Sequence, residues 1–143
     1  MAPEEIENGY EVFGRDFANA GRVSTSIKDI LKGLGIQAAI VRRVAIASYE
    51  AEMNLVMYAM RGRMRLTVSS EAITLHVDDE GPGIENISLA MQEGYSTATP
   101  EMREMGFGAG MGLPNIKKNS DEFVITSEVG RGTRLLIRVF LVA

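Results

Sequence analysis

Several residue types are scarce in this chain of 143 residues, and each scarcity excludes a class of chemistry. The absence of cysteine excludes disulfide bonds, Cys-ligated zinc and Cys nucleophiles, and leads us to expect a cytoplasmic protein. A single histidine, His76, excludes metal centres built from several histidines. No apolar run approaches the roughly 18 residues of a membrane span, and the acidic, polar N-terminus does not resemble a signal peptide.

The composition that remains is typical of a globular protein. With 45% hydrophobic and 24% charged residues, a chain of this length can bury the core of one domain, which we expect to span residues 1–143. The formal net charge of −4 gives no reason to expect a nucleic-acid partner, and the lack of a long apolar run leads us to expect no membrane partner. A bound polyanion would therefore have to be held by local geometry.

Hydrophobic periodicity predicts an alternation of strands and helices. The predicted elements are a strand at 9–17, helices within 19–35 and at 37–60, a hairpin of strands at 63–69 and 72–79, a weakly periodic loop at 84–105, a helix at 111–121 and two strands within 122–143. Since two helices precede the hairpin, we expect an α/β two-layer sandwich with helices on one face of the sheet. The sheet should be either mixed but mostly antiparallel, or wholly antiparallel. A loop of this length is usually functional, and we expect a lid over about 84–112.

Glu50 and Asn54 form the first candidate pair for chemistry. Their spacing of four places both on one face of the 37–60 helix, close to its apolar stripe. An amide oxygen can bind Mg²⁺, which takes its other ligands from water and phosphate, while a carboxylate can orient or deprotonate a nucleophile. The alternative is a carboxylate and an amide at the solvated edge of a helix.

The motif DDEGPGI at 78–84 follows a predicted strand. An aspartate there can accept a hydrogen bond from an exocyclic amine, and Gly81 and Gly83 leave room for a flat ring against the backbone. The alternative is a plain turn that ends the strand. Thr133, in GRGTRL at 130–135, by itself indicates only a β-turn.

Residues 106–118, GFGAGMGLPNIKK, carry glycine at every second position before an apolar, lysine-tipped segment. These glycines come too late for a dinucleotide-binding βαβ unit, and no Gly-Lys-Ser/Thr follows as in a P-loop. A glycine strip that leads into a helix N-terminus can bind an anion through free N–H groups, whereas the alternative is a mobile glycine loop. Lys117 and Lys118 can reach a phosphate or line a solvated helix face.

The order of these motifs resembles a known family. Glu-x-x-x-Asn, Asp-x-Gly-x-Gly, a lid, Gly-x-Gly-x-Gly-x-Gly-Leu and Gly-x-Gly-Thr follow one another as in the GHKL superfamily of ATP-binding proteins, which has the Bergerat fold. The resemblance covers about residues 9–140. The stretches YEAEMNLVMYA, DDEGPGI and GMGLPNIKKNSDEFVITSEVGRGT are most similar to the anti-sigma-factor and stress-response switch serine kinases of the RsbT/RsbW type.

The resemblance implies a role for each motif. The residues implied to bind the nucleotide are Asn54, Asp79, Gly81, Gly83, Gly106, Gly108, Gly110, Met111, Gly112, Leu113 and Thr133. Asn54 is implied to hold Mg²⁺, with Glu50 as the general base. Asp79 is implied to accept the adenine amine, with Gly83 behind the ring and Thr133 completing the contact. Asp78 is a neighbour of the family aspartate, and we interpret it as a turn cap.

The resemblance also implies an activity and partners. It implies an ATP-dependent protein-serine kinase that phosphorylates a STAS-type anti-anti-sigma protein, with Glu50 orienting the serine hydroxyl. Contacts with a sigma factor or a PP2C-type phosphatase and homodimers through a sheet edge are also consistent with it. The alternatives are an ATP-gated binding module with little or no kinase activity and, less favoured without a transducer domain, an ATP-driven conformational cycle.

Overall fold

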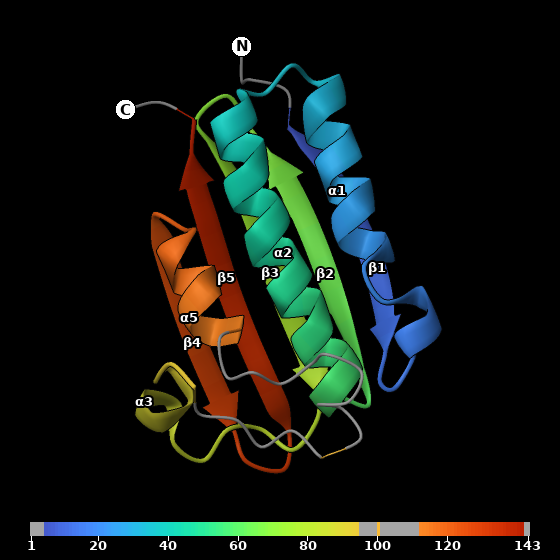
Figure 1. Ribbon diagram of the computed structural model, residues 1–143, viewed down its shortest axis with the longest axis vertical. Helices are drawn as coiled ribbons and strands as arrows, with labels where there is room; N and C mark the ends of the chain where they lie inside the picture. Colours follow the sequence, from blue (N-terminus) through green and yellow to red (C-terminus); the bar gives the residue numbers. More distant parts are fainter. Residues whose placement is uncertain (1–4, 95–99, 101–111, 142–143) are drawn as a thin grey trace.

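A computed structural model of the chain describes residues 5–94, 100 and 112–141. It shows a sheet with helices on one face (Figure 1). The elements are the strand β1 (Ile6–Phe13), the 3-10 helix η1 (Phe17–Asn19), the helices α1 (Arg22–Gly33) and α2 (Ala38–Tyr58), the strands β2 (Arg61–Val68) and β3 (Ala72–Glu80), the helices α3 (Ile87–Ala90) and α5 (Gly112–Lys118), and the strands β4 (Glu122–Glu128) and β5 (Gly132–Phe140). The strand order is β1-β2-β3-β5-β4, and each neighbouring pair is antiparallel.

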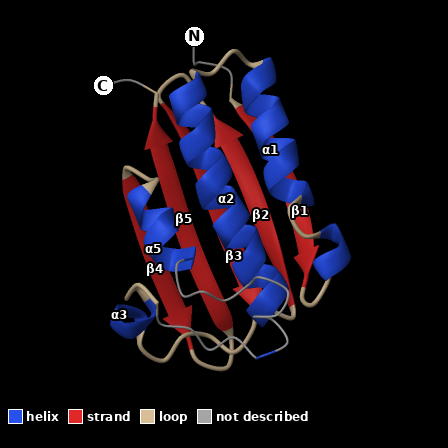
Figure 2. Cartoon of the chain, viewed as in Figure 1, coloured by secondary structure: helices blue, strands red, loops and turns tan. Residues whose placement is uncertain are grey.

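The predicted two-layer α/β sandwich is confirmed, and the structure decides between the two sheet arrangements that the sequence left open. Among the described residues the sheet is wholly antiparallel, because β5 lies between β3 and β4, which run in the same direction, and is antiparallel to both. Figure 2 shows α1, α2 and α5 over the same face of this sheet. None of the helices in the described ranges combines the length and the apolar character that crossing a bilayer requires.

The first strand differs from its predicted range. It begins three residues before position 9 and ends at Phe13 instead of continuing to residue 17. The reason is a turn in which the Gly14 N–H donates to the Met60 carbonyl at 2.9 Å and Arg15 adopts a left-handed φ of 66°. A β-carbon at Gly14 would lie 1.9 Å from the Ala59 carbonyl oxygen, so only glycine fits where the chain turns.

The hydrophobic core lies between the sheet and the helices. Alternate residues of the central strands are buried, and they are Met64, Leu66, Val68, Ile73, Leu75, Val77, Leu135, Ile137 and Val139. The facing stripe of α2 includes Val41, Val44, Ala47, Ala51 and Leu55. Since α2 packs on the sheet with α1 and α5 on either side of it, it is the element that positions the candidate site.

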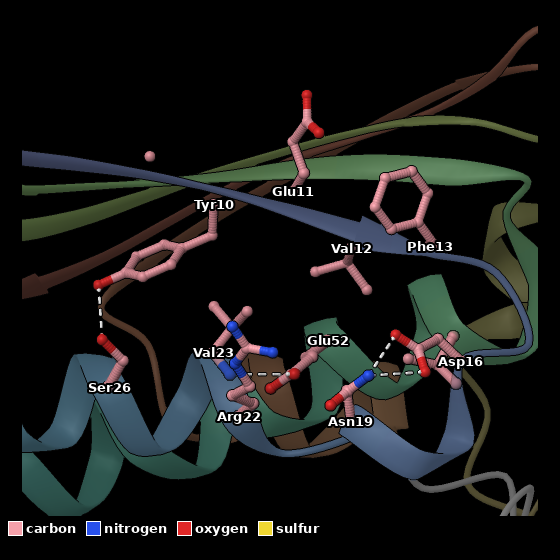
Figure 3. Close-up of a pocket in the computed structure, with 12 residues that line it drawn as sticks. Tyr10, Glu11, Val12, Phe13, Asp16, Asn19, Arg22, Val23, Ser26 and Glu52 are labelled. Carbon is pink, nitrogen blue, oxygen red and sulfur yellow. Dashed lines mark hydrogen bonds between the residues drawn. The ribbon is translucent and has the colours of Figure 1, made fainter.

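Glu52 fixes the start of α1 against α2, a contact that the sequence analysis did not predict. Its side chain is only 1% exposed and accepts hydrogen bonds from the backbone N–H groups of Gly21, Val23 and Ser24 at 3.1, 3.1 and 2.9 Å. The N-cap residue Gly21 has no side chain to satisfy these donors, so a carboxylate from the neighbouring helix does so. Figure 3 shows this carboxylate in the wall of a cavity of about 610 Å³ between β1 and α1.

Candidate functional site

Glu50 and Asn54 lie on α2 where the first residue of α5 packs against it. An ideal β-carbon at Gly112 would stand 3.2 Å from Asn54 Oδ1 and 3.3 Å from Glu50 Oε2. Glycine at this position therefore lets the start of α5 approach both polar groups closely. All three residues are partly buried, so the predicted pair is neither fully solvated nor part of the core.

The Glu50 carboxylate has an unusual environment for a helix-surface glutamate. Burial raises the pKa of Glu50 above its ordinary value of 4.5. Among the described residues, no hydrogen-bond donor or cation pairs with it. A partly desolvated carboxylate with a raised pKa is suited to accept a proton, which is the property of a general base.

Asp79, near the end of β3, is hydrogen-bonded to the start of β5. The Thr133 N–H donates to Asp79 Oδ1 at 3.0 Å, and both residues are partly buried. The pKa of Asp79 is raised above its ordinary value, chiefly by burial. The hydrogen bond from the Thr133 N–H opposes this rise, and the charge of Asp78 adds to it. A β-carbon at Gly132 would lie 2.0 Å from the Asp79 carbonyl oxygen, so this close pairing requires glycine.

Asp78 does not act as the turn cap that we predicted. Its side chain is exposed and faces the Arg134 guanidinium, with 3.4 Å between Oδ1 and Nε. Successive residues of a strand point to opposite faces, so Asp78 and Asp79 cannot share one role. The predicted distinction between the two aspartates thus has a geometric basis.

The segment after Asp79 is joined by backbone hydrogen bonds to the turn between β4 and β5. The Gly81 N–H donates to the Arg131 carbonyl at 3.2 Å, and the Gly130 N–H donates to the Pro82 carbonyl at 2.9 Å. Gly83 has a φ of 74°, and a β-carbon on it would lie 2.4 Å from the Glu128 carbonyl oxygen. Gly83 is therefore required by its backbone conformation and contacts, and the hydrogen-bonded segment forms a platform beside Asp79.

The same platform adjoins the end of α2. A β-carbon at Gly81 would stand 3.2 Å from the Ala59 α-carbon and 3.5 Å from the Tyr58 carbonyl oxygen. The helix that carries Glu50 and Asn54 thus ends against the segment that follows Asp79. Figure 1 shows this end of α2 and the loop after β3 at one end of the sandwich.

Other predicted site residues have different positions. Gly106, Gly108, Gly110 and Met111 lie outside the described residues, as does much of the lid predicted at 84–112. Within the described part of that range, a short helix, α3, begins after Asn86, whose side chain accepts a hydrogen bond from the Leu89 N–H. At the other end of the range, Leu113 packs against the hydrophobic core.

The two lysines of α5 are both exposed. Lys118 pairs with Glu93, so its ammonium group links α5 to the described end of the lid range. This contact favours the surface position over the phosphate contact for Lys118. Lys117 stays an exposed residue of the last turn of α5.

Ser127, in β4, belongs to the site and was missed by the sequence analysis. Its hydroxyl accepts a hydrogen bond from the Ile84 N–H at 2.7 Å and lies 2.9 Å from the Thr133 hydroxyl. The signal was a polar residue at a position where the alternation with Phe123 and Ile125 predicts an apolar one.

Three features together define a fold of the GHKL ATP-binding type. A helix presents a carboxylate and an amide to a glycine, this helix lies over an antiparallel sheet, and the aspartate at the end of one strand is hydrogen-bonded to a Gly-x-Gly-Thr turn. The chain belongs to the histidine kinase-like ATPase domain family, whose sequence profile matches residues 14–139.

Curated relatives share most of the chain. The serine/threonine-protein kinase RsbT of Bacillus subtilis (strain 168) is 30% identical over 112 residues, which are 76% of this chain and 78% of the relative. The anti-sigma F factor of Thermoanaerobacter sp. (strain X514) is 30% identical over 116 residues, or 81% of this chain and 73% of the relative. That of Caldanaerobacter subterraneus subsp. tengcongensis is 33% identical over the same length and the same shares. The predicted resemblance to the GHKL superfamily and to its switch kinases is confirmed.

Proposed function

We propose that this protein is an ATP-dependent protein-serine kinase that regulates a sigma factor by phosphorylating a STAS-type anti-anti-sigma protein. The observation that carries the proposal is Glu50, a partly buried carboxylate with a raised pKa that no described residue pairs with. A module that only binds ATP needs no such base. The relative named as a serine/threonine-protein kinase and the relatives named as anti-sigma F factors support the same reaction and pathway.

The strand ends and turns supply the base side of the proposed nucleotide site. Asp79 would accept a hydrogen bond from the adenine amine, Gly81 and Gly83 would lie against the ring, and Thr133 would complete the contact. Hydrogen bonds to the β4–β5 turn hold this segment in place, so little ordering is needed when the base binds. The glycines of 106–112 would close over the phosphates.

Asn54 fits the requirement for a magnesium ligand. In the described residues, no group of three or more His, Cys, Asp or Glu side chains could hold a metal ion by itself. Magnesium keeps several waters and takes ligands from phosphates, so one amide oxygen beside the phosphate side of the site is a suitable donor. When bound, the ion would neutralise negative charge on the phosphates.

Glu50 would act on the incoming serine of the protein substrate. As the serine oxygen forms its bond to the γ-phosphorus, the bond from that phosphorus to the bridging oxygen of ADP breaks, and Glu50 accepts the serine proton. The close packing of Gly112 against Glu50 and Asn54 leaves the base, the amide and the start of α5 next to one another. Positioning of this kind supplies most of the catalysis in phosphoryl transfer.

The proposal is tested by transfer of label from γ-labelled Mg·ATP to a purified STAS-domain protein from the same genome. Wild-type protein should label the partner on serine, and Glu50→Gln should bind ATP but label the partner at least about a hundredfold more slowly. If wild-type protein binds ATP and forms a complex with the partner without labelling it, the kinase proposal fails and an ATP-gated binding module replaces it.

A further inference from the structure

Ser127 occupies an inward-facing position at the end of β4. Phe123 and Ile125, which share its face, pack against the hydrophobic core, but Ser127 places a hydroxyl there. A partly buried hydroxyl needs hydrogen-bond partners. Ser127 finds them in the segment after Gly83 and in the Gly-x-Gly-Thr turn, the two parts of the proposed adenine site.

Three polar atoms surround the Ser127 hydroxyl oxygen. The Ile84 N–H donates to it at 2.7 Å, the Thr133 hydroxyl oxygen lies 2.9 Å away, and the Gly132 carbonyl oxygen lies 3.1 Å away. A hydroxyl has one proton and two acceptor positions, and a carbonyl can only accept. All three contacts are hydrogen bonds only when Ser127 donates to Gly132 and accepts from both Ile84 and Thr133.

This arrangement decides what Thr133 can offer to a ligand. Its only hydroxyl proton is directed to Ser127, so toward a ligand Thr133 Oγ1 is an acceptor and not a donor. Beside it, Asp79 Oδ1 already accepts the Thr133 N–H, while Oδ2 accepts no hydrogen bond from any described residue. The site therefore offers the free Asp79 oxygen and the Thr133 hydroxyl as two acceptors.

We propose that Ser127 is a specificity-determining residue of the purine site, which orients the Thr133 hydroxyl as an acceptor so that the site recognises an amino group at position 6 of the base. The proposal rests on the proposed ATP site. An amino group has two N–H donors, which Asp79 and Thr133 can accept directly or through a water molecule. A purine without that group would leave both acceptors without a donor, which is costly in a partly buried site.

The test compares the binding of ATP with that of purine riboside triphosphate, which carries hydrogen in place of the 6-amino group. Calorimetry on the full chain with Mg²⁺ gives the ratio of the two affinities. Wild-type protein should favour ATP. In Ser127→Ala the Thr133 hydroxyl is free to rotate and donate, so the ratio should fall about tenfold, the worth of one hydrogen bond. Ser127→Thr keeps a hydroxyl and should keep the ratio.

A double-mutant cycle separates orientation of Thr133 from simple support of the backbone. Thr133→Val removes the oriented hydroxyl and should lower the ratio by a similar factor, and adding Ser127→Ala to it should change the ratio no further. If Ser127→Ala fails to fold, Thr133→Val and Ser127→Thr still test the two halves of the claim. Thr133→Val with the wild-type ratio would overturn the proposal.

The outcomes also distinguish this role from the proposed function. Ser127→Ala that weakens both nucleotides equally, or leaves the ratio unchanged, would overturn the specificity role and make Ser127 a structural tie for Ile84. Phosphoryl transfer by the wild-type protein would in that case still stand. Wild-type protein that binds neither nucleotide would overturn the ATP site, and the role of Ser127 with it.

Discussion

Glu50 is the side chain whose ionisation most directly tests the proposed transfer. A general base must be ionised, and burial raises the pKa of Glu50 above 4.5. The transfer rate should therefore increase with pH through this raised pKa and then level off. Glu50→Gln should lower the rate by about 10²- to 10⁴-fold and remove this acidic limb, as measured by initial rates across the pH range.

Glu50→Gln should raise the stability of the folded protein at neutral pH although it lowers the transfer rate. Since the pKa of Glu50 is higher in the folded than in the unfolded state, the stability that the carboxyl contributes below its unfolded pKa is lost as pH rises through the folded pKa. Glutamine has no charge to desolvate. Glu50→Gln should therefore have the higher Tm at neutral pH, and this advantage should vanish in acid. A variant with a lower Tm than wild type at neutral pH would contradict the costly burial of this carboxylate.

Asp79 and Asp78 offer a matched pair for testing the base side of the site. Asp79→Asn can keep the hydrogen bond from the Thr133 N–H to Oδ1, but it replaces the free oxygen with a donor that opposes the adenine amine. We expect the affinity for ATP to fall at least about a hundredfold in calorimetric titrations. Asp78→Asn alters an exposed ion pair with Arg134 and should change the affinity less than about threefold. Equal effects of the two substitutions would refute the assignment of Asp79.

The turn between β4 and β5 is the element on which the platform depends. Gly132 has a φ of 150°, and an added β-carbon would meet the Asp79 carbonyl oxygen at 2.0 Å. Gly132→Ala should therefore displace the turn and lower the free energy of unfolding by at least about 3 kcal/mol. Gly130 has a φ of 83° but open space around it, so Gly130→Ala should cost only about 1 kcal/mol, the strain of the left-handed backbone. Urea unfolding of the two variants would measure both values, and a Gly130→Ala as damaging as Gly132→Ala would show that backbone strain alone governs the turn.

The elements themselves were predictable to the extent that their signals are local. The long helix predicted at 37–60 is found as α2, Ala38–Tyr58, because its apolar periodicity is uninterrupted by Gly or Pro. The strand predicted at 9–17 was wrong at its end because Gly14 and Arg15 turn against the loop after α2, a contact from distant sequence. Glu52 could not have been predicted, since its three backbone partners lie 28 to 31 residues away along the chain.

For the candidate site, sequence order predicted the motifs but not the contacts that join them. The spacing of Glu50 and Asn54 predicts a shared helix face, but only the fold shows that Gly112 packs against both. The pairing of Asp79 with Thr133 joins residues 54 positions apart. Ser127 carried a local signal, a polar residue in an apolar alternation, whose meaning depended on the neighbours that the fold supplies.

Across the whole molecule, the proposed nucleotide would contact α2, α5, β3 and β5, which are parts of one packed sandwich. A ligand that binds only the folded state stabilises it by about 2.7 kcal/mol at a hundred times its Kd. Mg·ATP should therefore raise the Tm of the entire chain in a single transition.

If Asn54 holds the metal, the extra stabilisation on adding Mg²⁺ to ATP should be large in wild type and nearly absent in Asn54→Ala. ATP in EDTA should stabilise both proteins alike. Thermal unfolding with Asn115→Ala on α5 as a control would measure this, and a full magnesium effect in Asn54→Ala would rule Asn54 out as the ligand.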